Sequence, residues 1–537
     1  MTDAAIATRP LHEDPAIHAR RWGILGVLCL SLVLVVMSVS GPNVAIPSLQ
    51  RDLGASATEL QWIVDAYAIV FAGLLLTAGA LGDRFGRKGA LVVGLLLFGL
   101  ASVPGALADT PALVIASRAA MGVGAALIMP ATLSLITAVF PPQERGRAIA
   151  IWAGFAGAGG ALGPLVVGGL LEWFWWGSAF IVNVVVVAVV VLAVTTIAPR
   201  SRDDEATALD PVGATLSLVG LGSLLFGIIE GPTRGWSDAL VVSAFAVAAV
   251  VLVAFIVWER RSTHPMLPLG FFGDRRFSVG SAVITVAFFA MFGFFFLFTQ
   301  YLQFVRGYSA FFAGVATLPI AATLVAVSPR SSGLAERFGL GRVIGAGFAF
   351  MAAGFAVLAT VGPDAPYLLL ALSLVLLGVG MGVTVAPATG GIMTSVPMGK
   401  AGVGSAVNDT TRELGGALGI AVLGSIVTST YSGALDVGGL PAVFAEPAGE
   451  SIGAAAGVAE QLGGDAGRAL MVDAGQAFTD AMNVTMATSA VIAVVAGVVV
   501  FVVLGRRRAS DEVVGGVTID VGSDDADPAG VTAPSLR

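Results

Sequence analysis

Long apolar runs separated by short polar segments make up most of the chain between residues 24 and 504. A helix needs about 20 apolar residues to cross the hydrocarbon core of a bilayer. By that measure the pattern predicts fourteen transmembrane helices, and an even number places both termini on the same side of the membrane. The helices are expected at residues 24–42, 60–80, 90–108, 112–136, 147–171, 177–197, 208–229, 239–258, 278–300, 311–329, 342–361, 366–388, 404–429 and 484–504.

The basic residues of the polar segments indicate the orientation of these helices, because Lys and Arg are concentrated in cytoplasmic loops. With a cytoplasmic N-terminus, only Arg51, Arg234, Arg306 and Arg468 fall outside. Most of the others fall on the cytoplasmic side: Arg20, Arg21, Arg84, Arg87, Lys88, Arg145, Arg147, Arg200, Arg202, Arg260, Arg261, Arg275, Arg276, Arg330, Arg337, Arg342 and Arg506–Arg508. We therefore expect both termini to be cytoplasmic.

A short basic turn, from Gly79 to Gly89, joins the second and third predicted helices. Two membrane helices joined by so short a turn must be antiparallel neighbours. Its central part, LGDRFG at 81–86, recurs as LAERFG at 334–339, after the tenth predicted helix. Repeated halves are typical of secondary transporters. The chain is therefore expected to contain a duplicated structure.

This repeat predicts an all-α fold of two six-helix halves with two helices inserted between them. The N-terminal half spans 23–199, the inserted pair 200–262 and the C-terminal half 263–505. Residues 1–22 form a polar cytoplasmic segment without a cleavable signal peptide, and 506–537 an acidic tail that we expect to be disordered. The acidic, Gly/Ala-rich segment 431–480 is expected outside, either as a solvated loop with one amphipathic helix or as a vestibule that attracts substrate.

Composition agrees with a polytopic membrane protein and excludes other classes. Hydrophobic residues make up 56% of the chain and charged residues 12%, about half of the 25% typical of soluble proteins, and the mean hydropathy is +0.91. No basic stripe interleaved with aromatic residues indicates nucleic-acid binding. The single cysteine, Cys29, lies in an apolar run, and the histidines at 12, 18 and 264 lie outside such runs. We expect neither a disulfide framework nor a metal site.

Asp65 is an acidic residue inside the second predicted helix, in the stretch QWIVDAY at 61–67. Charged residues within membrane helices are costly and usually functional. A carboxylate that loses water favours its protonated form, so Asp65 could exchange a proton for a cationic substrate, with Gln61 and Tyr67 beside it. The alternative is that Asp65 lies near the outer interface, pairs with Arg51 or a backbone amide, and only holds the helix in place.

Arg118 lies in the fourth predicted helix, one turn before Gly122. An arginine keeps its charge at physiological pH, so Arg118 cannot carry the proton itself. It could modulate a nearby acid or bind an anion. The alternative is a residue at the cytoplasmic end whose charged head extends to the interface.

The fifth predicted helix is rich in glycine and contains Pro164. Glycine at helical spacing lets helices approach closely, and proline removes a backbone hydrogen bond and bends the helix. Gly163 and Pro164 are therefore candidates for a rocking interface, and simple tight packing is the alternative. The glycines are Gly154, Gly157, Gly159, Gly160, Gly163, Gly168 and Gly169.

Two further sets of residues have both a functional and a structural interpretation. Asn408, Asp409, Arg412 and Glu413 begin the thirteenth predicted helix; they could form a cytoplasmic gate, but we slightly favour an ordinary charged helix start. The ninth helix is aromatic on all sides, so that most rings contact lipid or neighbouring helices and some could receive a flat apolar cation. Its aromatic residues are Phe288, Phe289, Phe292, Phe294, Phe295, Phe296, Phe298 and Tyr301.

These residues resemble the major facilitator superfamily, and within it the fourteen-helix drug:proton antiporters. Gly79 to Leu91 is similar to the signature between helices 2 and 3, and Arg118 with Gly122 to the helix-4 motif. Helix 5 is similar to the antiporter signature, although Val167 replaces one glycine. The stretch at 62–67 is most similar to exporters of quaternary ammonium compounds and cationic dyes. Further matches are NVAIP at 43–47 and QFVRGYS at 303–309.

The resemblance implies that Asp83, Arg84, Arg87 and Lys88, with Gly79 and Gly86 of the same motif, lock one conformation against the opposite half. It also implies a part for Arg118 in proton coupling. One departure concerns coupling itself, because many members carry an aspartate where this chain has Ser38.

We therefore expect a multi-pass protein of a bacterial cell membrane that exports drug-like, cationic compounds in exchange for protons. Its energy source would be the proton gradient, without a cofactor, and it would act as a monomer and not as an enzyme. The first alternative is an exporter dedicated to an endogenous metabolite or antibiotic, since fold does not fix substrate. The second is a non-transporting membrane sensor.

Overall fold

The computed structural model describes residues 11–55, 57–201, 210–263, 265 and 267–505 of the 537-residue chain. The regular elements of these residues are all helices, and fourteen are long and apolar enough to cross a membrane. The predicted tail and His264 lie outside the described residues. The fourteen helices are α1 (Pro15–Ser40), α3 (Ala57–Phe85), α4 (Arg87–Ala106), α5 (Pro111–Val139), α6 (Pro142–Leu171), α7 (Ser178–Ile197), α8 (Pro211–Arg234), α9 (Ala239–Arg261), α10 (Arg275–Gln300, continued by a π-helical turn Tyr301–Val305), α11 (Ala310–Phe338), α12 (Leu340–Leu358), α13 (Tyr367–Thr394), α14 (Ala401–Ala434) and α17 (Gly464–Gly505).

Three shorter helices lie between the membrane-spanning ones. They are α2 (Pro42–Leu53), α15 (Ala442–Glu450) and α16 (Ile452–Leu462). The prediction of one amphipathic helix in 431–480 is wrong, because α15, α16 and the first turns of α17 all lie there. Hydropathy misses such helices because they lack a long apolar run. The segment also packs: the Tyr431 hydroxyl donates to the Ala448 carbonyl at 3.1 Å, and Ile452 is buried.

Side-chain caps define where several helices begin. Asp14 accepts a hydrogen bond from the Ala16 amide at 2.8 Å, so α1 begins within the polar segment predicted at residues 1–22. Asp238 and Asp274 cap α9 and α10 in the same way. Such caps satisfy amides that have no partner inside the helix. The polar residues between the apolar runs therefore set the helix boundaries.

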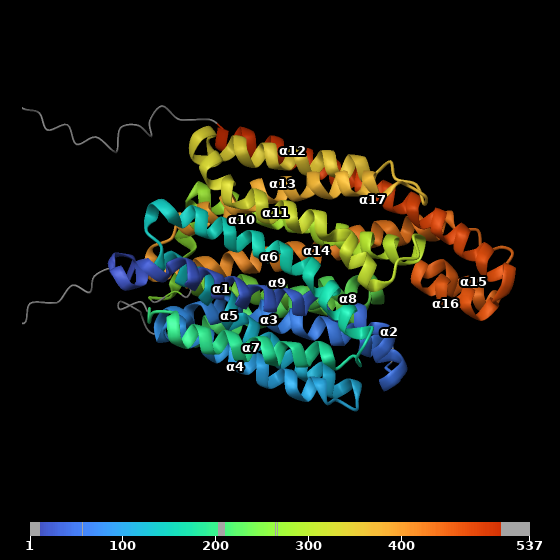
Figure 1. Ribbon diagram of the computed structural model, residues 1–537, viewed down its shortest axis with the longest axis horizontal. Coiled ribbons are helices and arrows are strands. Elements are labelled where there is room, and N and C mark those ends of the chain that lie inside the picture. The colour runs from blue at the N-terminus through green and yellow to red at the C-terminus, as the bar shows by residue number, and fades with distance from the viewer. Residues whose placement is uncertain (1–10, 56, 202–209, 264, 266, 506–537) are drawn as a thin grey trace, which may run out of the picture.

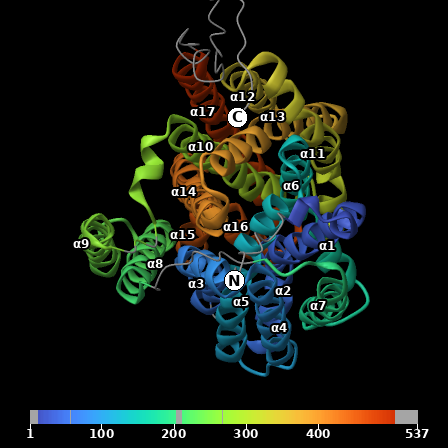
Figure 2. The ribbon, with the colours of Figure 1, turned by 90° about the vertical axis from the view of Figure 1, so that its left-hand side faces the viewer.

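Buried apolar side chains form two large clusters, one mostly on α1–α7 and the other mostly on α10–α17. Figure 2 looks along the bundle and shows α4, α5 and α7 on one side, α12, α13 and α17 on the other, and α8 with α9 at the flank. This is the arrangement of two six-helix halves with an inserted pair that the repeat predicts.

The two ends of the bundle differ in their loops. We call the end with the turn between α3 and α4 the basic end, and the end with α15 and α16 the loop end; in Figure 1 they lie at the left and the right. Helix α5 begins at the loop end and α14 begins at the basic end. A residue's distance along its helix therefore gives its depth in the bundle.

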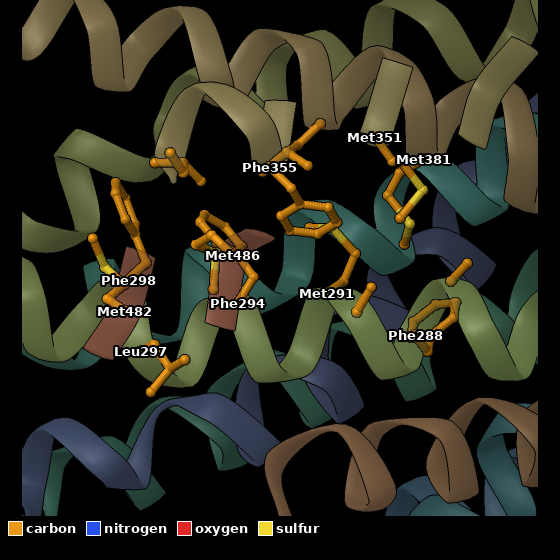
Figure 3. Close-up of a cluster of buried hydrophobic side chains, with 14 of the residues drawn as sticks. Phe288, Met291, Phe294, Leu297, Phe298, Met351, Phe355, Met381, Met482 and Met486 are labelled. Atoms are coloured by element: carbon orange, nitrogen blue, oxygen red, sulfur yellow. The ribbon is translucent and has the colours of Figure 1, made fainter. Parts of the chain in front are cut away.

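Most of the aromatic face of α10 belongs to the core of the C-terminal half. Figure 3 shows Phe294 and Phe298 pointing towards side chains of other helices in this half, among them Phe355 and Met486. The ring centroids of Phe294 and Phe298 are 5.0 Å apart, and these two residues are 0% and 1% exposed. These rings contact neighbouring helices, which is the commoner of the two expectations for this stripe.

Candidate functional site

Asp83 connects the two halves at the basic end. It lies in the last turn of α3, and one of its carboxylate oxygens accepts hydrogen bonds from the amides of Gly402 and Val403, at 2.8 and 3.3 Å. These amides belong to the first turn of α14, where a helix has free N–H groups and a positive dipole end. The carboxylate of one half therefore caps a helix of the other.

Arg87 completes this contact from the first turn of α4. Its guanidinium lies 2.9 Å from the Asp83 carboxylate and donates to the Met398 carbonyl at 2.7 Å, on the opposite half, and to the Ser201 hydroxyl at 3.1 Å. The side chains of Arg87 and Asp83 are only 3% and 6% exposed. A buried ion pair with these extra hydrogen bonds holds its geometry, and removing either partner leaves a buried charge.

The backbones of α3 and α14 touch beside this pair. A Cβ atom on Gly402 would lie 2.5 Å from the Gly79 carbonyl oxygen and 2.7 Å from the Asp83 carboxylate carbon. A larger residue at either glycine would separate the halves. The basic end is therefore closed by a contact that only glycine permits.

Lys88, another residue of the predicted lock, forms hydrogen bonds within its own half. It donates to the carbonyls of Thr195 and Ala198, at 2.8 and 2.7 Å, and so holds the end of α7. The Arg84 guanidinium lies over the Phe85 ring, 5.5 Å from its centroid. Gly86 has a φ of 113°, a value that favours glycine, and makes the turn possible.

Arg118 lies in the second turn of α5, near the loop end, and is 1% exposed. Its guanidinium donates to the carbonyls of Ile63 and Ser38, at 2.8 and 2.7 Å, and lies 4.5 Å from the centroid of the Tyr67 ring. The alternative of an interfacial arginine at the basic end is wrong, because α5 begins at the opposite end and the side chain is enclosed.

Asp65 belongs to the same group of residues. It is half-buried on α3, and the charge of Arg118 interacts with it. Tyr67 is fully buried, and its hydroxyl donates to the Val35 carbonyl at 3.1 Å. The side chains of Gln61 and Arg51 lie outside the described part of the chain, so the proposed neighbour and the alternative partner of Asp65 both stay predictions.

A second charged cluster lies on α14, and here the favoured interpretation is wrong. Asp409, Arg412 and Glu413 are two to three turns inside the helix and not at its start, and their side chains are only 0%, 5% and 11% exposed. Arg412 lies 3.1 Å from the Asp409 carboxylate and 3.7 Å from that of Glu413. Asn408 accepts from the Thr389 hydroxyl and donates to Asp409. Buried charges of this kind are typically functional.

The α14 cluster faces the N-terminal half. The Arg412 guanidinium approaches the Met129 sulfur of α5 at 3.5 Å and lies over the Phe288 ring, 5.5 Å from its centroid. The Tyr67 hydroxyl is near enough to the charges of Arg412 and Glu413 to interact with both. Tyr67 of the N-terminal half therefore interacts with Arg118 of its own half and with the α14 cluster of the other.

Helix α6 contributes to two interfaces. Gly154 and Gly157 face Ser328 and Leu324 of α11 in the other half, whereas a Cβ on Gly163 would lie 2.8 Å from the Met37 carbonyl of α1. Gly163 therefore packs within its own half, which agrees with the tight-packing alternative. Pro164 lies inside α6 beside it.

Comparison with known proteins agrees with this geometry. A family model described as Major Facilitator Superfamily matches residues 28–420. The chain is 35% identical over 489 residues to the multidrug efflux pump LfrA of Mycolicibacterium smegmatis, covering 91% of this chain and 97% of LfrA. It is 33% identical to the methyl viologen resistance protein SmvA of Salmonella typhimurium, covering 88% and 95%. The human organic anion transporter MFSD10 has a similar fold, with a TM-score of 0.56, 14% identity and coverage of 88% and 98%.

Proposed function

The chain belongs to the major facilitator superfamily, and from this membership we propose that it is a proton-coupled antiporter that exports lipophilic cations. The supporting observation is that each half holds acidic side chains next to an arginine within its membrane-spanning helices. Asp65 lies beside Arg118 on one half, and Asp409 with Glu413 beside Arg412 on the other. A proton and a cation compete for a carboxylate that is shielded from water, because either one neutralises its charge.

Transport then proceeds by rocking the two halves against each other. In the structure the basic end is closed by Asp83, Arg87 and the glycine contact. Binding a cation or a proton shifts the equilibrium only as far as its affinities for the two states differ. Opening this end must break the hydrogen bonds by which Asp83 caps α14. The contacts at the basic end therefore set the free energy of the state that is open there.

Of the pair Asp65 and Arg118, only the acid can gain and lose a proton, because an arginine keeps its charge. We therefore assign the protonation site to Asp65. Arg118 donates to the Ser38 carbonyl, at the position where many related proteins carry an acid, and it remains close enough to influence Asp65. Release of the proton from Asp65 would leave a carboxylate that can bind a cation.

We also propose that the basic end is cytoplasmic and that a single chain is sufficient for transport. The arginines and lysines gathered at that end support the orientation, and both halves of the interface come from one chain. The protein would need no cofactor and would perform no enzymatic reaction. The organism's cytoplasmic membrane is the expected location.

Efflux of ethidium, a fluorescent lipophilic cation, from proteoliposomes under an imposed proton gradient tests this function. The wild type is expected to export the dye and Asp65→Asn to lose gradient-driven export, whereas Asp52→Asn, an exposed acid on α2, should behave as wild type. Equal export by wild type and Asp65→Asn would place the proton site elsewhere. No export by the wild type would favour a dedicated metabolite exporter or a non-transporting sensor.

A further inference from the structure

A cationic side chain already occupies the acidic cluster on α14. Both carboxylates, of Asp409 and Glu413, lie within 4 Å of the Arg412 guanidinium, at 3.1 and 3.7 Å. All three side chains are enclosed by protein, at 0–11% exposure. The guanidinium is the resident counter-ion of the second of the two acidic groups on which the proposed function rests.

The guanidinium also makes the contacts that an exported aromatic cation would require. It lies over the face of the Phe288 ring, 5.5 Å from its centroid, where a cation is attracted by the ring quadrupole. It touches Met129 of the opposite half at 3.5 Å. A lipophilic cation entering between the halves would therefore meet Arg412 at the same ring and the same carboxylates.

The charges in the cluster do not cancel. When both carboxylates are ionised, they and the one guanidinium leave one net negative charge, since the guanidinium keeps its proton. Because an uncompensated buried charge is costly, this site matches one positive charge. Without Arg412 the same site would hold two negative charges and would match a dication.

We propose that Arg412 sets the charge of the exported compound: as a resident counter-cation, it restricts the α14 site to monocations. This inference rests on the proposed export of cations. It adds that Arg412 selects among cations by their charge. Arg412 acts by compensating charge, and Asp409 and Glu413 are the groups that bind the exported cation.

The test compares ethidium, a monocation, with methyl viologen, a dication, in the same proteoliposomes under the same proton gradient. Arg412→Gln is expected to raise the ratio of methyl viologen to ethidium export on the order of tenfold, since it removes one charge about 4 Å from the bound cation. Arg412→Lys, which keeps the charge, should retain the wild-type ratio.

Loss of Arg412 leaves Asp409 without its partner and can destabilise the protein, so a charge-balanced variant is needed. Arg412→Gln combined with Asp409→Asn keeps one net negative charge and should return the ratio to the wild-type value. Equilibrium binding of both compounds to purified protein gives the same ratio for a variant that transports slowly.

The outcomes separate this inference from the proposed function. An unchanged ratio in Arg412→Gln, with a wild type that exports ethidium, overturns the role of Arg412 and leaves cation export in place. A double variant that keeps a high ratio also overturns it, because charge would not be the cause. A wild type that neither binds nor exports either compound contradicts the proposed function itself.

Discussion

The two copies of the basic turn have nearly the same backbone. Gly86 and Gly339 both have positive φ, at 113° and 89°, and each ends one helix and begins the next. In the second copy the Arg337 guanidinium lies over the Phe338 ring, 5.2 Å from its centroid, as Arg84 does over its neighbour at 5.5 Å. The repeated sequence thus specifies a repeated turn.

The polar contacts of the two turns differ. Asp83 is 4% exposed and caps α14, whereas its counterpart Glu336 is exposed. Leu340 stands where the first copy has Arg87. The helix that faces the second turn, α6, carries its own acid in the first turn, Glu144, paired with an arginine of α1 at 2.7 Å. The carboxylate of Glu336 therefore cannot cap α6 as Asp83 caps α14, because Glu144 already lies in the first turn of α6.

This difference teaches that duplication has preserved a hinge-like turn and that only one copy has become a lock. The α3–α14 contact combines a buried ion pair, a helix cap and a glycine approach. The α6–α11 contact has a glycine opposite a serine, with Gly146 facing Ser332. Rocking would therefore meet its main electrostatic barrier at one contact.

The largest effect is expected from Gly402→Val, which attacks the lock by steric means. Its Cβ would lie 2.5 Å from the Gly79 carbonyl oxygen, a backbone atom that cannot move aside. The closed state should lose population, and dye export should fall by about tenfold or more, since a tenfold shift needs only about 1.4 kcal/mol. Gly333→Val, where a Cβ meets nothing within 4 Å, should export as wild type. Normal export by Gly402→Val would show that closure here is dispensable.

Exchanging the residues that distinguish the turns should have strongly unequal effects. Arg87→Leu gives the first turn the residue of the second and leaves Asp83 buried without its partner, at a cost of about 3–5 kcal/mol. Leu340→Arg places an arginine beside an exposed acid and should change stability by less than about 0.5 kcal/mol. Thermal unfolding of the purified variants measures both, and similar losses would contradict a one-sided lock.

The shared backbone predicts equal effects for a third pair of substitutions. Gly86→Ala and Gly339→Ala should each cost about 1–2 kcal/mol, because both positions have a φ unfavourable to residues with a Cβ. The two unfolding temperatures should fall together, and dye export should fall further in Gly86→Ala, which also displaces the lock. Clearly unequal stability losses would mean that the two backbones are not equivalent in solution.

The smallest effect tests a helix cap that lies within one half. Asp274 accepts hydrogen bonds from the amides of Arg276 and Phe277, at 2.7 and 3.1 Å, and from the Ser395 hydroxyl at 3.0 Å. Burial raises the pKa of its carboxyl, but these hydrogen bonds outweigh burial and the pKa is lowered overall. Asp274→Ala should cost about 1 kcal/mol without changing dye selectivity.

The sign of this pKa shift gives the pH dependence of that cap. A lowered folded-state pKa means that the stabilisation is complete above the ordinary value of about 3.9 and is lost as pH falls through the folded-state value. The difference in unfolding temperature between wild type and Asp274→Ala should therefore be constant near neutral pH and shrink below pH of about 4. A difference that grows in acid would contradict the shift.

The sequence predicts the spanning helices and the repeated turn well, because both depend on local pattern. Twenty apolar residues or a glycine with positive φ are visible in a single segment. The same pattern does not predict α2, and it predicts only one helix where α15 and α16 lie, because each of these helices is short and lies outside the apolar runs. Their positions depend on packing, as in the contact between Tyr431 and the Ala448 carbonyl.

The charged residues show the limit more clearly. The sequence slightly favours an ordinary charged helix start over a gate at Asp409 and Arg412, yet α14 begins at Ala401 and encloses them. The spacing of three between acid and arginine was a usable signal of a pair within one helix. The burial of this pair against α5 depends on which helices pack together, and a single sequence does not reveal that packing.

A distance measurement across the basic end tests the one-sided lock most directly. Spin labels at Gly89 on α4 and Thr394 on α13 report the separation of the halves, and a pair at Gly89 and Arg200 serves as a control within one half; the single native cysteine is buried in α1. In Asp83→Asn the first distance should shift towards a longer population while the control stays fixed, and Glu336→Gln should leave both unchanged. Equal distributions in the two variants would contradict the account.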